Sequence, residues 1–323
     1  TAAMLYTSGT TGNPKGVMLS FENLLSNMEG IIAREIITDR DQTLALLPFH
    51  HVLPLMVTLV VMHSGASIVF VSKIASKEML EALGKNRVTI MVGVPRVYKL
   101  LADGIKAQID SSFLPRQIYK STKFLKSMKI RKTIFAKVHK KLGSNLKQLI
   151  SGGAKLDVEV GELFERLGFY VTEGYGLTET SPIIAVATIT ERKLGTVGKL
   201  LPRTEVKIVE DEIWIKGPQV MKGYYNKPDK TKEIITEDGW LKTGDLGDLD
   251  SEGYLTVKGR KSSMIVLSNG KNIDPEAIET KIQAISKNLI KELGIVPKNE
   301  KLNAIVVPDL VEFKKQGKTN IQQ

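Results

Sequence analysis

Hydrophobic and polar positions along the first half of the chain form blocks with two different periods. Short, nearly uninterrupted apolar runs favour strands that are buried on both faces, as in parallel sheets. Between them, apolar residues recur at helical spacing. The predicted strands are Thr43–Leu47, Ser67–Val71, Ile90–Val94, Gln148–Ile150 and Tyr170–Glu173, and the predicted helices include Phe21–Arg34, Lys77–Asn86 and Val158–Leu167. This alternation predicts an α/β fold with layers built on a parallel sheet.

The pattern changes after Thr190. Three segments alternate apolar and polar residues, and turns rich in Gly, Pro and Asp separate them: Glu205–Val209, Glu212–Lys216 and Tyr254–Lys258. Alternation of this kind is typical of antiparallel strands, so we expect a small β-barrel-like section here.

A domain boundary is predicted near Gly259–Ser262. Residues 1–261 would form a large domain, of which this chain holds the C-terminal portion, and residues 262–323 would begin a small, mobile α+β domain. A strand at Met264–Leu267 and a helix at Glu276–Ile285 open that second domain. Asp274 is placed to cap this helix, with Pro275 at its first position.

The segment Thr43–Ser72 has no charged residue and is longer than the roughly 20 apolar residues that cross a bilayer. Proline and histidine residues interrupt it, however, and its cleanest apolar run, Val52–Met62, is too short to span. A buried strand, a helix and a second buried strand are the better interpretation.

Composition excludes several kinds of chemistry. The chain has 323 residues and no cysteine, which rules out disulfides, zinc–thiolate sites and cysteine nucleophiles. The lack of cysteine fits a reducing cytoplasm, where we expect the protein to lie. Its four histidines are badly spaced for a metal cluster. Because Thr1 opens inside a predicted strand, we expect a fragment that lacks its N-terminal part and its C-terminal end.

The formal net charge of +11 is concentrated in residues 111–155, which contain twelve Lys and Arg residues and no Asp or Glu. A solvated helical face is the commonest explanation of such a run. Apolar residues at near-helical spacing, among them Ile118, Phe124, Phe135 and Leu142, leave open a basic amphipathic hairpin that rests on an anionic membrane, at the inner face. Nucleic acid is not expected, because aromatic residues are only 6% of the chain and no nucleic-acid-binding motif is present.

The stretch Tyr6–Gly16 carries hydroxyl groups, glycines and one lysine directly after an apolar run. Glycine lets backbone N–H groups approach a ligand closely, and such a loop at a strand end suits phosphate oxygens. The candidate phosphate-binding residues are Thr7, Ser8, Gly9, Thr10, Thr11, Gly12 and Lys15.

Four further segments follow in order: Ser151–Leu156, Glu173–Thr180, Trp240–Gly247, and Gly259–Ser262 with Gly270–Ile273. Each alone is an ordinary turn or loop. Together with Tyr6–Gly16, they stand in the order found in the adenylate-forming enzymes, which include acyl-CoA synthetases, peptide-synthetase adenylation domains and luciferases. The chain therefore resembles that family.

The resemblance implies a role for each motif. The first loop and Lys15 would handle the β- and γ-phosphates of ATP. Gly152, Gly153 and Ala154 would face adenine. Of the next motif, Glu173, Gly174, Tyr175, Gly176 and Thr178 would bind nucleotide, with Tyr175 along adenine, Thr178 on the α-phosphate and Glu179 holding Mg²⁺. Asp245 and Arg260 would bind the ribose. The chain departs from the pattern at Ser262, where relatives usually carry Asp or Lys as the hinge residue.

The resemblance also indicates the acid that is activated. Pro48–His51 is similar to the family's aromatic–histidine segment, which would place His51 beside the acyl group. Amino-acid-activating members typically carry an aspartate where this chain has His50, so an acid without an α-amino group is expected. Val52–Met62 would then either line a tunnel for an alkyl chain or simply pack in the core.

The segments Val94–Tyr98 and Leu267–Ile273 resemble bacterial long-chain fatty acyl-CoA synthetases. The implied reaction joins a fatty acid to ATP as an acyl-adenylate and passes the acyl group to CoA or, alternatively, to an acyl-carrier protein. The catalytic lysine of the family's small domain would lie outside this chain. The truncated chain would therefore be impaired in adenylation, or would be a non-catalytic nucleotide-binding module. The sequence predicts no oligomeric state.

Overall fold

The computed structural model describes residues 1–7, 14–71, 77–266, 272–286, 289–298, 301–315 and 317. The chain divides into two compact units. The first comprises residues 1–243 and 247–257, and the second comprises residues 244–246 and 258–323. Each unit is described by itself.

The first unit is built on a seven-stranded sheet with the strand order β4-β3-β5-β6-β7-β8-β9. The first five strands are parallel, whereas β8 and β9 join antiparallel. The strands are β3 (Gln42–Ala45), β4 (Ser67–Phe70), β5 (Ile90–Gly93), β6 (Gln148–Ser151), β7 (Tyr170–Gly176), β8 (Ile183–Val186) and β9 (Lys199–Leu200). The predicted α/β fold with a parallel sheet is confirmed.

Strand β7 runs three residues beyond its predicted end at Glu173, because it changes partner there. Tyr170–Glu173 pairs in parallel with β6, and Gly174–Gly176 pairs antiparallel with β8. The second half contains two glycines and shows no apolar alternation, so the pattern gave no sign of a strand.

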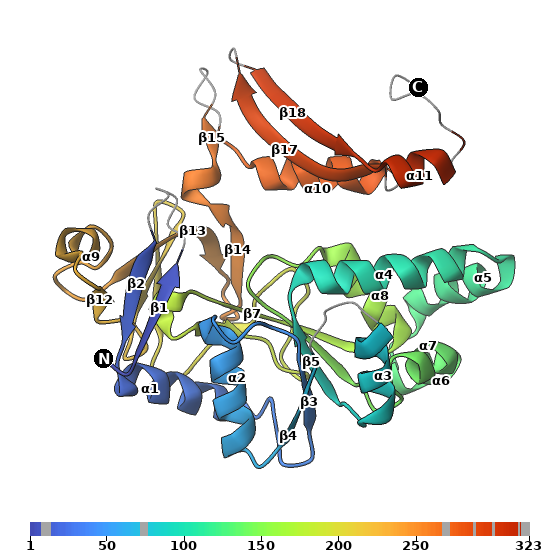
Figure 1. The fold of residues 1–323 in the computed structure, drawn as a ribbon, viewed down its shortest axis with the longest axis horizontal. Coiled ribbons are helices and arrows are strands. Elements are labelled where there is room, and N and C mark those ends of the chain that lie inside the picture. Colours follow the sequence, from blue (N-terminus) through green and yellow to red (C-terminus); the bar gives the residue numbers. More distant parts are fainter. Residues whose placement is uncertain are drawn as a thin grey trace. The chain divides into compact units, whose positions relative to one another are not determined.

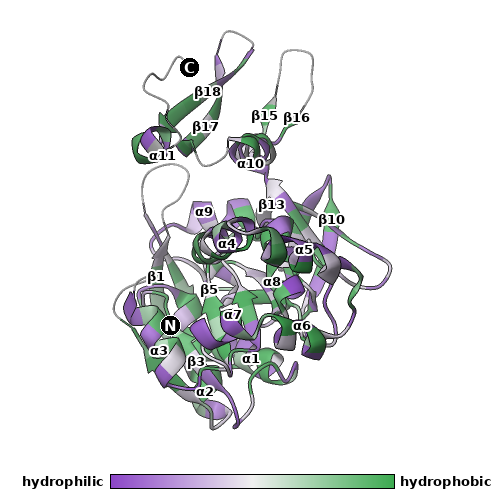
Figure 2. Ribbon diagram, turned by 90° about the vertical axis from the view of Figure 1, so that its right-hand side faces the viewer, coloured by the Kyte–Doolittle hydropathy of each residue, from purple (hydrophilic) through white to green (hydrophobic). Residues whose placement is uncertain are grey.

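Helices cover both faces of this sheet, with α1 and α2 on one side of the central strands and α3, α4 and α8 on the other (Figure 1). Hydrophobic residues gather in the sheet and on the inner sides of the helices (Figure 2). The helices are α1 (Phe21–Ile32), α2 (Val52–His63), α3 (Lys77–Lys85), α4 (Pro95–Asp110), α5 (Phe113–Ser121), α6 (Met128–Ile134), α7 (Ala136–Lys141), α8 (Val158–Leu167) and α9 (Pro228–Ile234), with the 3-10 turns η1 (Thr122–Phe124) and η2 (Thr178–Thr180).

Two smaller sheets contain further strands. One has the order β1-β2-β12, with β1 (Ala3–Thr7), β2 (Lys15–Leu19) and β12 (Gly223–Tyr224). The other has the order β10-β11-β13-β14, with β10 (Glu205–Val209), β11 (Glu212–Lys216), β13 (Leu241–Leu249) and β14 (Leu255–Arg260). The antiparallel hairpin β10–β11 has the bounds expected from its alternating pattern.

The second unit takes in residues 244–246 of β13 and the end of β14. Its further elements are η3 (Lys261–Ser263), β15 (Ile265–Val266), β16 (Asn272–Ile273), α10 (Pro275–Ile285), β17 (Ile290–Lys298), β18 (Lys301–Pro308) and α11 (Leu310–Lys315). The strands β17 and β18 form an antiparallel hairpin.

The uncharged segment Thr43–Ser72 folds into β3, α2 and β4, with helix α2 only 12 residues long. None of the described helices combines the length and the apolar composition needed to cross a bilayer.

A buried carboxylate ties together the amino ends of three neighbouring strands. Asp41, just before β3, accepts hydrogen bonds from the Thr89 hydroxyl before β5 and pairs with the Lys147 ammonium before β6, each at 2.7 Å. Burial alone would raise the pKa of Asp41, but Lys147, Thr89 and the Thr38 donors outweigh it, so the pKa lies below its ordinary value.

We predict that Asp41→Asn lowers the free energy of unfolding by about 1.5–3 kcal/mol at neutral pH, because charged hydrogen bonds are lost at a buried site. Since folding lowers the pKa, the carboxylate stabilises the fold above its ordinary pKa, and this stabilisation disappears as the pH falls through the folded-state value. Urea unfolding between pH 3 and 7 checks this. A difference between the two proteins that stays constant in acid would contradict it.

Candidate functional site

Two glycine-containing segments meet at the carboxyl ends of the parallel strands. The Gly152 N–H donates to the Gly93 carbonyl at the end of β5, at 3.1 Å. A Cβ atom on Gly152 would lie 3.5 Å from the Leu53 side chain and 3.6 Å from the Gly174 carbonyl. Gly153 has a φ of +81°, which favours glycine. The turn after β6, strand β7 and the first turn of α2 therefore approach one another at the edge of the sheet where α/β proteins bind ligands.

Glu173 contacts the segment that follows this turn. Its carboxylate accepts a hydrogen bond from the Leu156 N–H at 3.3 Å, and the side chain is buried. Burial raises the pKa of Glu173 to about 7, although the Leu156 and Gly195 N–H groups and the charge of Lys155 oppose the shift. The sequence placed Glu173 among the nucleotide-binding residues, and that role stays a prediction.

Steric contacts and hydrogen bonds fix the backbone of residues 176–182, around η2. A Cβ on Gly176 would lie 1.7 Å from the Pro182 carbonyl oxygen, so only glycine fits. The buried Thr180 hydroxyl donates to backbone carbonyls and accepts from the Leu177 N–H at 2.9 Å. Thr178 and Glu179 thus sit on a 3-10 turn, η2, whose backbone is fixed on both sides.

Lys15, Tyr224 and Glu179 come together from three distant segments. The Tyr224 hydroxyl donates to Glu179 Oε1 at 2.7 Å, and Lys15 Nζ lies 4.7 Å from the centroid of the same ring. The Met221 N–H donates to the Glu179 carbonyl at 2.9 Å. The tyrosine is buried, so a cation and a carboxylate are held near one rigid ring.

The predicted phosphate loop is only partly described. Thr7 ends β1 and lies opposite Lys15, which begins β2. Ser8, Gly9, Thr10, Thr11 and Gly12 lie outside the described residues.

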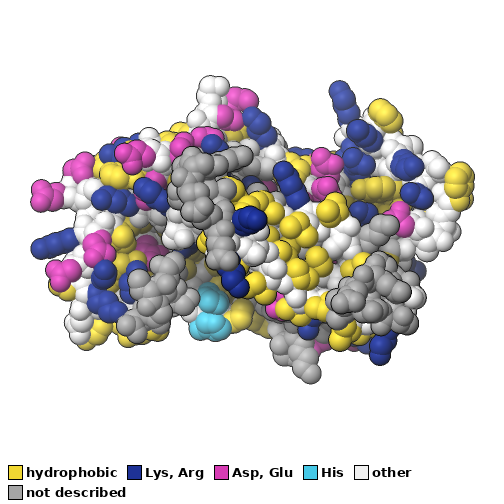
Figure 3. Space-filling view, turned by 90° about the horizontal axis from the view of Figure 1, so that it is seen from above, with side chains coloured by type: hydrophobic (Ala, Val, Ile, Leu, Met, Phe, Trp, Pro, Cys, Tyr) yellow, Lys and Arg dark blue, Asp and Glu magenta, His cyan; other side chains and the backbone are white. Residues whose placement is uncertain are grey.

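His51 occupies the N-cap position of α2 and is exposed next to His50, with the ring centroids 4.2 Å apart. Histidine side chains lie together on the face drawn in Figure 3. Val52, the residue after His51, packs with Val17 and Tyr224 in one buried cluster, so the start of α2 adjoins the Lys15–Tyr224 region.

Two buried asparagines support this region, and sequence reasoning missed both. Asn23 Nδ2 donates to the carbonyls of Pro218 and Val220, at 2.7 and 2.8 Å. Asn27, one turn later on α1, donates to Ile183 O at 2.6 Å and accepts from Ile183 N. Asn27 thus fixes the backbone that follows η2, and Asn23 fixes the segment just before Met221, whose N–H donates to the Glu179 carbonyl. Two asparagines four residues apart within a predicted amphipathic helix were the available signal.

Asp245 and Arg260 belong to the second unit, where they pair with each other. Arg260 Nε lies 3.0 Å from Asp245 Oδ1, and the aspartate side chain is nearly buried. The two residues that the resemblance assigned to one ribose are therefore neighbours.

Glu179 could ligate a Mg²⁺ ion that is bound together with a nucleotide, because such an ion needs few ligands from the protein. No cluster of three or more His, Asp or Glu residues that could hold a metal ion occurs in the described part of the chain. Mg²⁺ usually takes one or two carboxylates and completes its shell with water and substrate phosphates. A single carboxylate at Glu179 near the Lys15 ammonium matches that requirement.

Comparison with known proteins gives the family. The model of the AMP-binding enzyme family matches residues 1–225. The chain belongs to the AMP-binding enzyme family. The predicted membership of this family is thereby confirmed, whereas the match does not test the roles of single residues.

Two curated relatives of this family are long-chain fatty acid ligases. The chain is 33% identical to the long-chain-fatty-acid–CoA ligase FadD15 of Mycobacterium bovis, over 88% of this chain and 50% of that protein. It is 31% identical to the chloroplastic long-chain-fatty-acid–[acyl-carrier-protein] ligase AEE15 of Arabidopsis thaliana, over 97% and 51%. The chain thus spans about half the length of the curated relatives it matches.

A solved structure shows the same fold. The ATP-bound MatB from Rhodopseudomonas palustris is 30% identical and superposes with a TM-score of 0.76, covering 95% of this chain and 58% of MatB. The AMP-binding fold of this chain therefore matches that of a protein crystallised with ATP.

The raised pKa of Glu173 predicts how this buried carboxyl affects the stability of the protein at different pH values. Because the folded state binds the proton more tightly than the unfolded chain, the stabilisation that protonated Glu173 contributes is complete below pH 4.5 and is lost as the pH rises to about 7. Glu173→Gln removes the ionisation, so the difference in unfolding free energy, variant minus wild type, should increase by roughly 2–4 kcal/mol as the pH rises across this range.

Chemical unfolding at pH 4, 5.5, 7 and 8 measures the difference. Glu159→Gln, an exposed carboxylate on the neighbouring helix α8, serves as the control and should show no such trend. An equal pH dependence in Glu173→Gln and wild type would show that the buried carboxyl does not titrate as proposed.

Proposed function

We propose that this chain carries the nucleotide site of an enzyme that activates a long-chain fatty acid with ATP and transfers the acyl group to the thiol of CoA. The observation that carries the proposal is the meeting of Lys15, Tyr224 and Glu179 beside the glycine turns of β6 and β7. Family membership and the names of the relatives support it.

In the first step a carboxylate oxygen of the acid attacks the α-phosphorus of ATP, and pyrophosphate leaves. The thiolate of the acceptor then attacks the acyl carbonyl, and AMP leaves. Both steps concentrate negative charge on phosphate oxygens, so fixed positive groups in a site that excludes water supply most of the stabilisation.

The side chains of the first unit divide this work. We propose that Lys15 would bind the β- and γ-phosphates with the hydroxyls of residues 7–12, that Thr178 would donate to the α-phosphate, and that Glu179 would ligate a Mg²⁺ ion, which would supply positive charge to the phosphate oxygens. Gly152, Gly153 and Ala154 face adenine from the turn after β6, with Gly174, Tyr175 and Gly176 alongside on β7 and Glu173 behind the turn. His51 adjoins the acyl carboxylate.

We propose that Asp245 and Arg260 serve the ribose of the nucleotide. Asp245 accepts from both ribose hydroxyls, since one carboxylate can accept two hydrogen bonds. Arg260, 3.0 Å away, holds that carboxylate in place. We place the domain boundary between residues 261 and 262 and the hinge at Ser262, where a change of φ and ψ would move the small domain.

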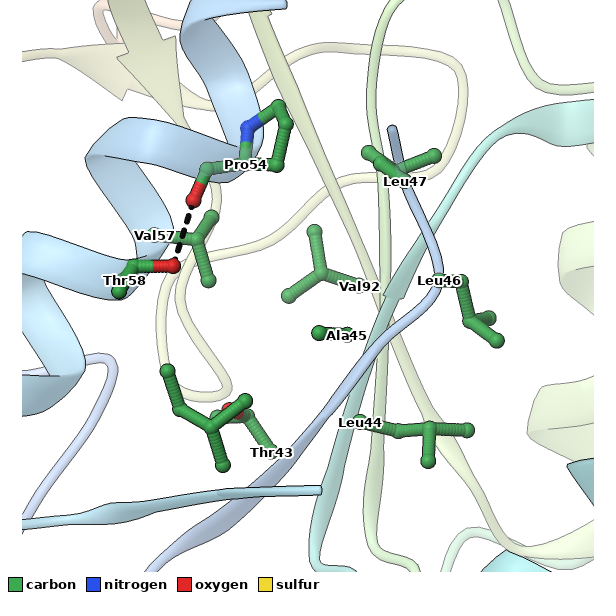
Figure 4. A pocket seen from close by; sticks show the side chains of 10 residues that line it. Thr43, Leu44, Ala45, Leu46, Leu47, Pro54, Val57, Thr58 and Val92 are labelled. Atoms are coloured by element: carbon green, nitrogen blue, oxygen red, sulfur yellow. Dashed lines mark hydrogen bonds between the residues drawn. The ribbon is translucent and has the colours of Figure 1, made fainter. Parts of the chain in front are cut away.

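A fatty acid is the proposed substrate because the surroundings of α2 are apolar. A small hollow of about 20 Å³, too small to hold an acyl chain itself, shows the character of these surroundings: it lies between this helix and strands β3, β4 and β5, and its lining, which includes Ala45, Leu47, Pro54, Val57 and Val92, has no charged residue (Figure 4). The Thr58 hydroxyl that borders the pocket donates to the Pro54 carbonyl at 2.8 Å, so it offers little polarity. No acidic side chain in this lining would pair with an α-ammonium group.

The similarity to the acyl-carrier-protein ligase AEE15 favours a second acceptor, the pantetheine thiol of a carrier protein. Either acceptor would meet the enzyme in the cytoplasm, where we propose that it acts.

Pyrophosphate release from ATP tests the activity. Palmitate should stimulate release and a mixture of amino acids should not, with CoA and a carrier protein compared as acceptors. Calorimetry with ATP and Mg²⁺ is run in parallel on the same protein. Release with amino acids alone would contradict the fatty acid proposal. Tight ATP binding without any release would identify the chain as a nucleotide-binding module.

Glu179→Gln should lower the rate of pyrophosphate release by about 10²–10³-fold, because it removes one contact to the transition-state charge. Its effect on the unfolding free energy should be smaller, about 1 kcal/mol, because the glutamine oxygen can still accept from the Tyr224 hydroxyl. Tyr224→Phe keeps the ring under Lys15 but loses the hydroxyl that orients Glu179. It should raise the Mg²⁺ concentration for half-maximal rate several-fold. Glu233→Gln, an exposed carboxylate on α9, is the control. Glu179→Gln with unchanged Mg²⁺ dependence and rate would remove this residue from the metal site.

A further inference from the structure

The apolar residues of the basic segment 111–155 fall into two groups. Phe135 and Leu142 are buried, and Tyr119 and Val138 pack against the same hydrophobic core. These residues hold the segment to the protein, so the expected amphipathic hairpin does not present them to solvent. The second group is exposed. Ile130 and Ile134 of this group are on α6, and the others are on α5 and η1: Phe113 is exposed by 77%, Leu114 by 67%, Ile118 by 36% and Phe124 by 84%. We call these last four residues the α5 surface.

Helical geometry places the α5 surface on one side of α5 and η1. Residues 113, 114 and 118 lie on neighbouring positions of a helix with 3.6 residues per turn, together with the uncharged Gln117. The opposite side is defined by Tyr119, in contact with the core, and by Thr122, which is fully buried. In Figure 1, α5 extends at one end of the first unit, away from the sheet.

Basic side chains border this surface. Arg116, Lys120, Lys123 and Lys126 are exposed on the same stretch of chain. Within the segment, Arg131, Lys132 and Lys147 make internal contacts with Glu165 O, Ser144 O and Asp41. The acid nearest in sequence is Asp110, at 3.9 Å from Arg116. The surface is therefore apolar at its centre and positive at its edge.

We propose that the α5 surface docks on an anionic lipid bilayer, with Phe113, Leu114, Ile118 and Phe124 entering the interface and Arg116, Lys120, Lys123 and Lys126 binding lipid phosphates. Large apolar side chains with basic neighbours are the signature of helices that lie in the membrane interface. Each basic residue near an anionic surface adds attraction that salt screens.

The charge pattern decides against two other occupants. A second copy of the chain would bring one basic segment against another, and like charges across an interface repel. Single-stranded nucleic acid would use the lysines and could stack on the two phenylalanines. It gains nothing from Leu114 and Ile118, whose aliphatic side chains do not stack on bases.

Co-sedimentation of the chain with vesicles tests this proposal. Vesicles of phosphatidylcholine with phosphatidylglycerol should bind the protein at low salt, and pure phosphatidylcholine vesicles should bind it at least tenfold more weakly. The double variant Phe113→Ser/Phe124→Ser should lower the partition coefficient at least tenfold. Lys120→Gln/Lys123→Gln should lower it roughly thirtyfold on anionic vesicles.

Matched control variants distinguish binding through the α5 surface from non-specific binding to vesicles. Phe21→Ser removes an equally exposed phenylalanine from α1, and Lys222→Gln/Lys232→Gln removes two exposed lysines near β12 and α9. Both should bind vesicles like the wild type, and circular dichroism should show all variants folded. Equal losses in the control and α5 variants would overturn the proposal. So would salt-independent binding, a dimer that the α5 variants dissolve, or an oligonucleotide that binds more tightly than the vesicles.

Discussion

The hydrogen bond from the Tyr224 hydroxyl to Glu179 is the contact on which the proposed site depends. It joins β12 to η2, while the face of the same ring lies near the ammonium of Lys15 on β2. A triphosphate with Mg²⁺ needs a cation for its oxygens and a carboxylate for its metal, close to each other but not neutralised by direct pairing. A buried tyrosine ring that contacts both groups meets this need, because it orients each of them.

The surroundings of this contact are mostly backbone held by buried polar side chains. Asn27 on α1 fixes the backbone at Ile183, after η2, and Asn23 fixes the segment at Pro218 that leads to Met221, while Glu173 fixes the turn that carries Gly152 and Gly153. A buried amide without its partners is costly, so each of these groups selects a single local conformation. Rigidity at these positions lets short loops on a large sheet present their donors at fixed places.

The sequence was most informative where structure depends on neighbours in the chain. Helix α8 and the hairpin β10–β11 have the predicted bounds, because hydrophobic period is a local signal, and the side chain of Asp157 caps α8 by accepting from the Glu159 N–H. The second half of β7 was missed because its pairing with β8 is decided by tertiary contacts. For the same reason, sequence reasoning missed Asp41, Tyr224 and the two asparagines, since the side-chain partners cited for them lie 45 to 197 residues away in the chain. The motif residues came from resemblance to a family, which names roles but does not show contacts.

The central claim is that ATP binds around Lys15, Tyr224 and Glu179. A crystal structure of the chain with ATP and Mg²⁺ tests it most directly. The metal should lie within bonding distance of Glu179, the β- or γ-phosphate within reach of Lys15, and the adenine against the turn at Gly152 and Gly174. Nucleotide bound elsewhere on the protein, with Glu179 still hydrogen-bonded to Tyr224 and far from the metal, would contradict the proposed site.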